Sequence, residues 1–245
     1  GISTQENVLQ FDGDDIVSAG RGTGDVLAIS GDVTVELWVQ PSVMQNSHFL
    51  TFGGATETST DNVLYSLEML GDGSLRFSHE TTASEDITAT TSPGLLTQGE
   101  WAHVAATRDT SSGEITLYVN GENVAVIPYS GEAIGGENAE LTFGAFDNFH
   151  GLMDEARVWN SVKSDREIAE NYQRHLGEDE IEQATDLVGY WDFDEKTADG
   201  AFADLTGNGA NAVLGHVSDN TNHLSHFTSF DGVDDNIVIA HDSSY

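Results

Sequence analysis

The chain has 245 residues, with 42 acidic side chains against 8 basic ones, so its formal net charge is −34. This charge argues against a nucleic-acid partner, because the phosphate backbone would repel the surface, and it disfavours anionic membranes for the same reason. The sequence contains no cysteine, which excludes disulfides and thiolate metal sites, and no apolar run approaches the ~20 residues that span a bilayer.

Short alternating runs, separated by turn signals, predict an antiparallel β-sandwich. In residues 33–40, four aliphatic side chains alternate with Thr34, Glu36, Trp38 and Gln40. Further runs of this kind occupy residues 74–80, 101–109, 114–127, 141–146 and 153–160. The run at 114–127 contains Asn-Gly at its centre, which predicts a two-residue hairpin turn. Many short strands at this spacing are typical of a sandwich or jelly roll.

One helix is predicted at about residues 165–176. Ser164 and Glu167 have the spacing of a capping box, and three apolar side chains then follow at intervals of four. These three are Ile168, Tyr172 and Leu176. Gly177 is a favourable residue for ending the helix, and the acidic segment 178–186 is predicted to be an exposed linker.

A strand-like motif near the start returns near the end of the chain. The sequence FDGDDIV at 11–17 is repeated as FDGVDDNIV at 230–238. This distance is the size of a domain, so we expect one unit in residues 1–215 and either a terminal strand or the start of a second unit in 216–245. Residues 187–215 either complete the first unit or open the second. We favour completion, because half a unit alone would expose its inner face to water.

Several segments together resemble a known family. They are FDGDDIV, VTVELWVQP, GEWAHVAATRD, GEITLYVNGENV, LTFGAFDNFHGLMDEARVWN and LVGYWDFDE followed by DLTGNGANAVLG. In this order they resemble the laminin-G-like, concanavalin A-like jelly-roll modules of bacterial secreted proteins. The resemblance implies two antiparallel sheets in a jelly roll, often one structural Ca²⁺, and binding of sugars or other ligands. It also implies neighbouring modules in a longer chain, at a secreted or cell-surface location.

Clustered carboxylates are the candidate calcium ligands. Asp12, Asp14 and Asp15 place three carboxylates within four residues, and such crowding is relieved by a hard cation such as Ca²⁺. Asp204 and Asn208 lie in a glycine-containing segment that would let carbonyls face an ion. The family resemblance adds the strand with Asp154 and Glu155. Adjacent strand residues face opposite sides, so we expect only one of these two to reach a given site.

A polar and aromatic loop is the candidate ligand-binding segment. It consists of Phe146, Asp147, Asn148, Phe149 and His150. Amide, carboxylate and aromatic groups together are typical of polyol recognition, although the family uses a comparable aromatic to pack this turn. All four tryptophans lie in predicted strands, and we expect core packing for at least three of them.

The sequence argues against an enzyme. The nearest match to paired glycosidase carboxylates is the acidic string at 178–182, whose surroundings are typical of a linker. We therefore predict a non-catalytic, Ca²⁺-supported module that recognises glycans or cell surfaces, as in an adhesin. A structural spacer in an extracellular array is the first alternative, and a glycan hydrolase or lyase of the same fold is the second.

Overall fold

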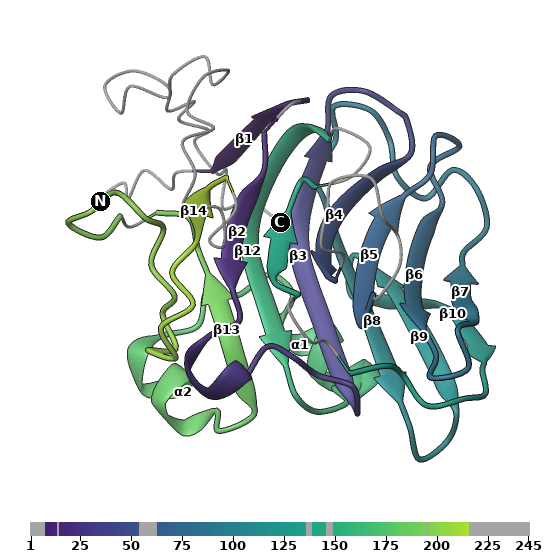
Figure 1. Cartoon of the computed structure of the whole chain (residues 1–245). Helices are drawn as coiled ribbons and strands as arrows, with labels where there is room; N and C mark the ends of the chain where they lie inside the picture. Colours follow the sequence, from purple (N-terminus) through teal and green to yellow (C-terminus); the bar gives the residue numbers. More distant parts are fainter. Residues whose placement is uncertain are drawn as a thin grey trace.

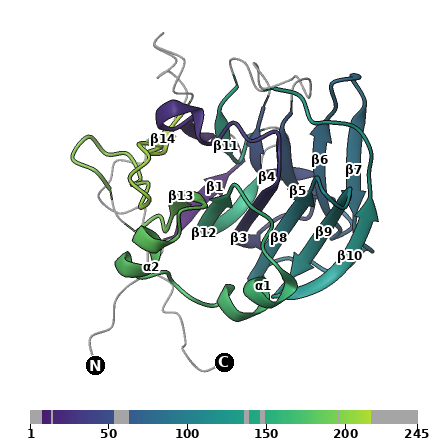
Figure 2. The ribbon, with the colours of Figure 1, turned by 90° about the horizontal axis from the view of Figure 1, so that it is seen from below.

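The computed structural model describes most of the chain between Val8 and Gly215. The described residues are 8–13, 15–53, 63–135, 139–145, 149–194 and 196–215. They form two antiparallel β-sheets packed face to face, with two short α-helices on one outer surface (Figures 1 and 2). The predicted all-β antiparallel jelly-roll sandwich is therefore confirmed. Neither described helix is long and apolar enough to cross a membrane.

The first sheet, sheet A, has seven strands, and six of them follow the order β1, β12, β3, β8, β9, β10. Strand β13 pairs with β12 on the same edge as β1, next to the other half of β12. The strands are β1 (Leu9–Asp12), β3 (Val33–Pro41), β8 (Ala102–Asp109), β9 (Glu114–Val119), β10 (Glu122–Pro128), β12 (His150–Trp159) and β13 (Leu187–Trp191).

The second sheet, sheet B, also has seven strands, in the order β14, β2, β11, β4, β5, β6, β7. They are β2 (Val17–Gly20), β4 (Ser47–Phe52), β5 (Tyr65–Met69), β6 (Leu75–Glu80), β7 (Asp86–Thr90), β11 (Leu141–Phe143) and β14 (Val213–Leu214). Residues 187–215 thus place β13 in sheet A and β14 in sheet B. Residues 216–245, with the second copy of the motif, lie outside the described residues, so a second unit there stays a prediction.

Strand β3 shows why these sequences form a sandwich. Its four aliphatic side chains are fully buried between the sheets, as the alternation predicted. They are Val33, Val35, Leu37 and Val39. The polar residues between them point to the outer face of sheet A, where Glu36 is also buried, at 2% exposure. The outer face of sheet A is therefore covered as well, and α1 and α2 lie on that side (Figure 2).

Helix α1 (Asp165–Asn171) begins with the predicted capping box between Ser164 and Glu167. It ends at Asn171 rather than at residue 176, and side chains of sheet A donate to the carbonyl groups at this end. The indole of Trp38 donates to the carbonyl of Tyr172 over 2.9 Å, and Arg157 donates to the carbonyls of Asn171 and Arg174. These side chains thus satisfy carbonyls at the end of α1, and the carbonyl of Asn171 also accepts the Arg174 amide over 3.0 Å.

The acidic segment after Gly177 is mostly exposed, as predicted, but it is a helix rather than a linker. Residues Glu178–Gln183 form α2, and Gly177 is its N-cap in an extended conformation rather than the end of α1. The side chain of Glu180 accepts the Gly177 amide over 3.0 Å. Three acidic residues in the first turn complement the positive end of the helix dipole, so the same charges that suggested a linker stabilise a helix start.

Candidate functional site

The predicted calcium turn follows β1. Asp12 ends this strand, and its backbone amide donates a hydrogen bond to Oδ2 of Asp15 over 2.9 Å. Strand pairing places Asp12 opposite His150, so a predicted calcium ligand and a predicted ligand-binding residue are neighbours. Asp14 lies outside the described residues. Calcium binding at this turn stays a prediction.

The two predicted ligands near residue 204 hold a loop in place. The carboxylate of Asp204 is buried and accepts four hydrogen bonds. The donors are the amides of Tyr190, Thr206 and Ala210 and the hydroxyl of Thr206. Asn208 donates its side-chain amide to a carbonyl of β13 over 3.1 Å. A cation would need the same carboxylate oxygens, so these contacts favour a loop anchor over a calcium ligand. The described part of the chain holds no group of three His, Cys, Asp or Glu that could bind a metal ion.

A β-bulge in β12 changes the expected orientation of Asp154 and Glu155. The pairing with β3 slips between Asp154 and Arg157, and Glu155 has a φ of 52°. Asp154 lies opposite Trp38, Glu155 contacts Arg157, and Ala156 is buried in the core. Both carboxylates therefore share the outer face of sheet A, and the expectation that they face opposite sides is wrong.

The predicted ligand loop is only partly described. Phe146, Asp147 and Asn148 lie outside the described residues. Phe149 is 1% exposed and packs edge-to-face against Phe11 and Phe49, with ring centroids 5.7 and 5.4 Å away. Its ring therefore fills the core and is inaccessible to a ligand, whereas the half-buried His150 starts β12 at the rim.

A buried charge network occupies the outer face of sheet A. Glu36 Oε1 accepts the indole N–H of Trp159 over 2.9 Å, and Oε2 lies 3.2 Å from His103 Nε2. Arg157 Nη1 lies 3.8 Å from Glu36, and its Nη2 is 2.5 Å from Glu155 Oε2. Burial alone would raise the pKa of Glu36, but His103, Arg157 and Trp159 outweigh it and hold this pKa at about 2. The network thus keeps Glu36 ionised, and Arg157 contacts the carbonyls at the end of α1.

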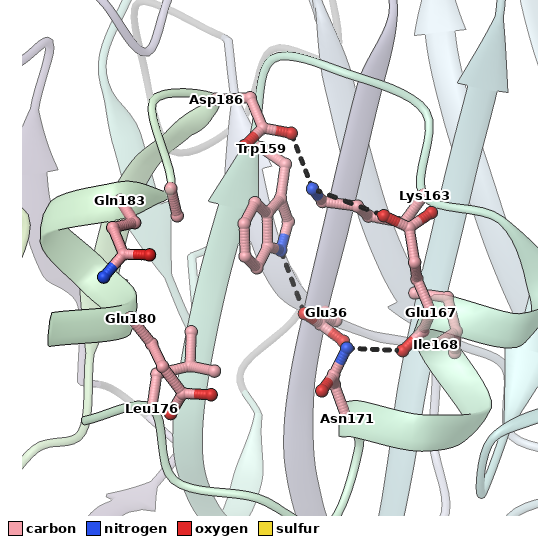
Figure 3. A pocket seen from close by; sticks show the side chains of 11 residues that line it. Glu36, Trp159, Lys163, Glu167, Ile168, Asn171, Leu176, Glu180, Gln183 and Asp186 are labelled. Carbon is pink, nitrogen blue, oxygen red and sulfur yellow. Dashed lines mark hydrogen bonds and ion pairs between the residues drawn. The ribbon is translucent and has the colours of Figure 1, made fainter.

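A groove of about 360 Å³ lies between α1 and α2 on this same face (Figure 3). Glu36 and Trp159 line its floor. The other lining residues are Lys163, Glu167, Ile168, Asn171, Leu176, Glu180, Gln183, Ala184 and Asp186. Sequence reasoning missed this groove because it treated 178–186 as a linker, whereas α2 forms one wall.

Across the outer face of sheet B runs a row of hydroxyl side chains, one from each of six neighbouring strands. In spatial order they are Ser18, Thr142, Thr51, Ser66, Ser78 and Thr88, and each lies opposite the next in the strand register. We call this set the hydroxyl row. The four hydroxyl side chains on β2, β11, β4 and β5 are almost fully buried. Ser78 on β6 is half-buried, and Thr88 on β7 is exposed. The accessible end of the hydroxyl row therefore lies on β6 and β7.

Beside the hydroxyl row lies a second set of opposed residues, the charged row. It consists of His48, Glu68, Arg76 and Thr90 on β4 to β7. Glu68 Oε1 lies 3.6 Å from Arg76 Nη1 and accepts the hydroxyl of Ser78, and Glu68 Oε2 is 3.7 Å from His48 Nε2. Arg76 also donates to Thr90 over 3.3 Å. Sequence reasoning did not single these residues out, although the alternation in 74–80 already placed Arg76 and Ser78 on one face.

Aromatic side chains are absent from the exposed surface of the described residues. Trp159 and Trp191 are buried, Trp38 and Trp101 are half-buried, and no Phe or Tyr in the described ranges is exposed. Trp191 packs in the core between the sheets, whereas Trp159 is buried on the outer face of sheet A and Trp38 stacks on Tyr172 beneath α1. The expectation of core packing for at least three tryptophans is therefore not met. The described surface therefore offers a ligand mainly polar side chains.

Solved structures share this fold at low sequence identity. The sialidase CBM40 of Ruminococcus gnavus, bound to α2,3-sialyllactose, has a TM-score of 0.59 at 15% identity, covering 69% of this chain and 98% of its own. A Bacteroides ovatus protein provisionally named a carbohydrate-binding protein has a TM-score of 0.61 at 19% identity, covering 87% and 59%. The SAP-like pentraxin of Limulus polyphemus has a TM-score of 0.53 at 14% identity, covering 87% and 97%. These likenesses concern the fold alone.

A search of the curated proteins gave no match. The family model described as the concanavalin A-like lectin/glucanases superfamily matches residues 11–169, which is more than half of the chain. These residues run from the second half of β1 through β12 and into α1. The resemblance inferred from the motifs is therefore confirmed, and the chain belongs to the concanavalin A-like lectin/glucanase superfamily.

Proposed function

We propose that this module binds glycans without catalysis, through the outer face of sheet B. The observation that carries the proposal is the charged row beside the accessible end of the hydroxyl row. Sugar hydroxyls both donate and accept hydrogen bonds, and neighbouring hydroxyls form pairs. A carboxylate and a guanidinium each offer two polar atoms in one plane, which suits such pairs.

The accessible groups of this surface lie over β5 to β7. The side chain of Arg76 is 32% exposed, that of Glu68 is 8% exposed, and Thr88 and Thr90 are exposed. Glu68 on the neighbouring strand β5 contacts both Arg76 and Ser78 and so fixes their positions. A glycan on this face would therefore contact Arg76 and the hydroxyls of β6 and β7 first.

Two further points support a glycan and narrow its class. The R. gnavus CBM40, which shares the fold, is bound to sialyllactose. In this chain, however, the net charge is −34, and Arg76 already has Glu68 as a neighbour. An anionic sugar would be repelled at long range, so we expect uncharged oligosaccharides to bind more tightly than sialylated ones.

A glycan array followed by titration tests the proposal. Replacing Arg76 by Gln should weaken binding of the best array ligand about fivefold or more, because hydrogen bonds to charged groups are worth about 1.5–3 kcal/mol. Arg166→Gln is the matched control. Arg166 is 82% exposed on α1 and pairs with Glu170, so it changes the charge equally but lies on the other side of the molecule. Equal affinities of both variants and the unaltered protein would contradict the proposal.

The alternatives have separate outcomes. A structural spacer would give no ligand on the array, and the lack of exposed aromatic side chains in the described ranges favours this alternative over an enzyme. A hydrolase or lyase would release reducing or unsaturated sugar ends from the array ligands. Release of such ends would overturn the non-catalytic part of the proposal.

We also propose that calcium supports the module and that it acts in a secreted or cell-surface protein, in an adhesin-like role. Three aspartates within residues 12–15 support the calcium proposal, whereas the contacts of Asp204 and Asn208 do not. Calcium that binds only the folded state would add about 2.7 kcal/mol at a hundredfold excess over Kd. The melting temperature should therefore fall in chelator. An unchanged melting temperature would leave the glycan proposal intact and remove calcium from it.

A further inference from the structure

His79 on β6 is a titratable side chain in the core of the sandwich. Side chains of β6 alternate between the two faces of sheet B, so Ser78 points outward and His79 points between the sheets. His79 is 1% exposed, and neither ring nitrogen has a hydrogen-bond partner among the described residues. A neutral imidazole carries one donor and one acceptor, and leaving both unpaired in the core is costly. Contact of this ring with water would relieve that cost.

The described groups around the His79 ring are aromatic or cationic. Tyr129 contacts the ring edge-to-face, with ring centroids 5.0 Å apart, and Phe77 lies 6.2 Å away on the same strand. Tyr65 on the neighbouring strand β5 is fully buried in this core, and its hydroxyl already donates to a backbone carbonyl. The Arg108 guanidinium on β8 also points between the sheets, where it donates to three backbone carbonyls. A proton on His79 would therefore add a second positive charge to this part of the core.

These surroundings keep His79 neutral in the folded protein. Burial lowers the pKa of His79, and the positive charge of Arg108 adds to this, so the pKa is about 4 rather than the usual 6.5. Two carboxylates nearby act on its neighbours instead, Asp32 on Arg108 and Asp109 on Tyr129. A state in which the ring reaches water binds a proton below about pH 6.5, whereas the closed state does not. The stability of the closed state is therefore full above about pH 6.5 and is lost as the pH falls through about 4.

A short segment after β10 joins the two sheets beside His79. We call residues 129–134 the clasp; they include Tyr129, whose ring contacts His79. The amide of Tyr129 donates to the turn between β8 and β9 in sheet A, and two backbone hydrogen bonds and an isolated bridge join the clasp to residues 80–82 after β6. β7 and β10 lie at this same side of the sandwich in both views (Figures 1 and 2). Residues 130–132 are exposed, as in segments that open locally while the rest of a fold stays intact.

We propose that His79 is an acid-sensitive switch: when its ring gains a proton, the clasp opens, β6 and β7 loosen, and a glycan bound on the outer face of sheet B is released. The release rests on the function proposed above, because β6 and β7 carry Arg76, Ser78 and Thr88. His79 lies opposite Ile87 in the register of these two strands, and β7 is an edge strand that pairs with β6. Movement of β6 would therefore disturb both strands that present the accessible polar groups.

Amide hydrogen exchange of the full chain, followed by NMR without any ligand, tests the switch itself. Between about pH 7 and about pH 5, the opening constant of amides in β6 and the clasp should rise about 20-fold after correction for the intrinsic exchange rate. Amides of α2, on the other side of the molecule, should show no such rise (Figure 2). Because about pH 5 lies above the ordinary range of carboxyl groups, a rise in this window indicates a histidine.

Variants assign the rise to one histidine. His79→Phe keeps an aromatic ring beside Tyr129 but cannot gain a proton, so it should abolish the rise, and His79→Leu serves the same purpose if the larger ring does not fit. His175→Gln is the matched control, because it removes a histidine that is 52% exposed on the sheet A side and should leave the rise unchanged. An opening constant that does not depend on pH, or an equal rise in His79→Phe, would overturn the switch.

A binding measurement separates the switch from its effect on the glycan. The best array ligand should bind about threefold or more weakly at about pH 5 than at about pH 7, whereas His79→Phe should bind it equally at both. A rise in opening without this loss of affinity would overturn glycan release. If the array yields no ligand, the proposed function fails together with glycan release, and hydrogen exchange alone decides whether His79 opens the clasp.

Discussion

Side chains alternate between the core and the outer face in both sheets, but the two outer faces differ in how far the rest of the chain covers them. On sheet A, the outward residues of β3 and β12 include the charged side chains of Glu36, Asp154, Glu155 and Arg157, and the chain folds back over them as α1 and α2 (Figure 2). Half of the eight cationic side chains lie in this layer, each within 4 Å of a carboxylate. They are Arg157, Lys163, Arg166 and Arg174. On sheet B, the outward residues are hydroxyls around Glu68 and Arg76, and no described helix covers them. The polar residues of sheet A are thus covered by the helices, whereas on sheet B those of β6 and β7 are accessible.

The largest loss of stability is expected when Arg157, the cation at the centre of the sheet A network, is replaced. Arg157→Met would leave Glu36 and Glu155 buried without their guanidinium and would free the carbonyls that follow α1. We expect a loss of about 3–5 kcal/mol in the free energy of unfolding, measured by urea denaturation. Arg76→Met on sheet B is the control and should cost at most about 1 kcal/mol, because its ion pair is partly exposed. Equal losses would show that the two faces do not differ as described.

Acid should destabilise the sheet A face through Glu36. Because its pKa is about 2 in the folded protein against 4.5 for an ordinary glutamate, Glu36 stabilises the fold above about pH 4.5, and this stability is lost as the pH falls towards 2. The contribution is about 3 kcal/mol. Unfolding free energies between pH 5 and about pH 2.5 should therefore fall less steeply for Glu36→Gln than for the unaltered protein. Parallel curves would contradict this origin of the acid sensitivity.

The turn of the hairpin between β9 and β10 packs against Tyr172, which follows α1 on the outer face of sheet A. This turn therefore tests how closely the chain covers that face. Asn120 and Gly121 both have positive φ, of 51° and 78°, as the predicted hairpin turn requires. A Cβ at Gly121 would also lie 2.6 Å from a ring carbon of Tyr172. Gly121→Ala should cost about 1–3 kcal/mol in thermal or urea unfolding. Gly94→Ala has a similar φ of 79° with nothing within 4 Å, so it isolates the backbone cost and should destabilise less. Equal effects would exclude the Tyr172 contact.

The smallest effect is expected at the exposed edge of the same layer. A hydrogen bond to Glu155 raises the pKa of His175, although partial burial opposes it. His175 therefore stabilises the fold below its unfolded pKa of about 6.5, and this contribution is lost as the pH rises through the higher folded value. Its side chain is 52% exposed, so His175→Gln should cost less than about 1 kcal/mol at pH 5 and nothing at pH 9. An NMR titration measures the pKa of His175 directly. An ordinary histidine value would contradict the hydrogen bond to Glu155.

Local patterns in the sequence predict the strands and turns of this fold well. The alternation in β3 and the Asn-Gly turn after β9 each depend on a few neighbouring residues, so they are visible without the tertiary structure. The end of α1 is different. It lies against sheet A, where Trp38 and Arg157 from distant strands donate to the carbonyls of Tyr172 and Asn171, and these contacts are not visible in the local sequence. Helix α2 was missed because charge composition alone suggests an exposed linker, and only the cap at Gly177 distinguishes the two.

The candidate sites depend on strand pairing, which the sequence does not reveal. The glycine-containing segment drew attention to Asp204, yet backbone amides surround its carboxylate. The bulge at Glu155 places it beside Asp154 on one face, which simple alternation contradicts. The charged row on sheet B becomes visible only when β4, β5 and β6 are placed side by side, because its members are scattered over residues 48 to 90.

Mapping a bound glycan on the full chain by NMR tests the central claim most directly. The best ligand from the glycan array would be titrated into labelled protein, and shifts of backbone amides would be assigned to strands. We predict that the largest shifts lie in β5, β6 and β7, around Glu68, Arg76 and Ser78, while α1 and α2 remain unchanged. Shifts confined to the helices, or to the turn after β1, would contradict glycan binding on the outer face of sheet B.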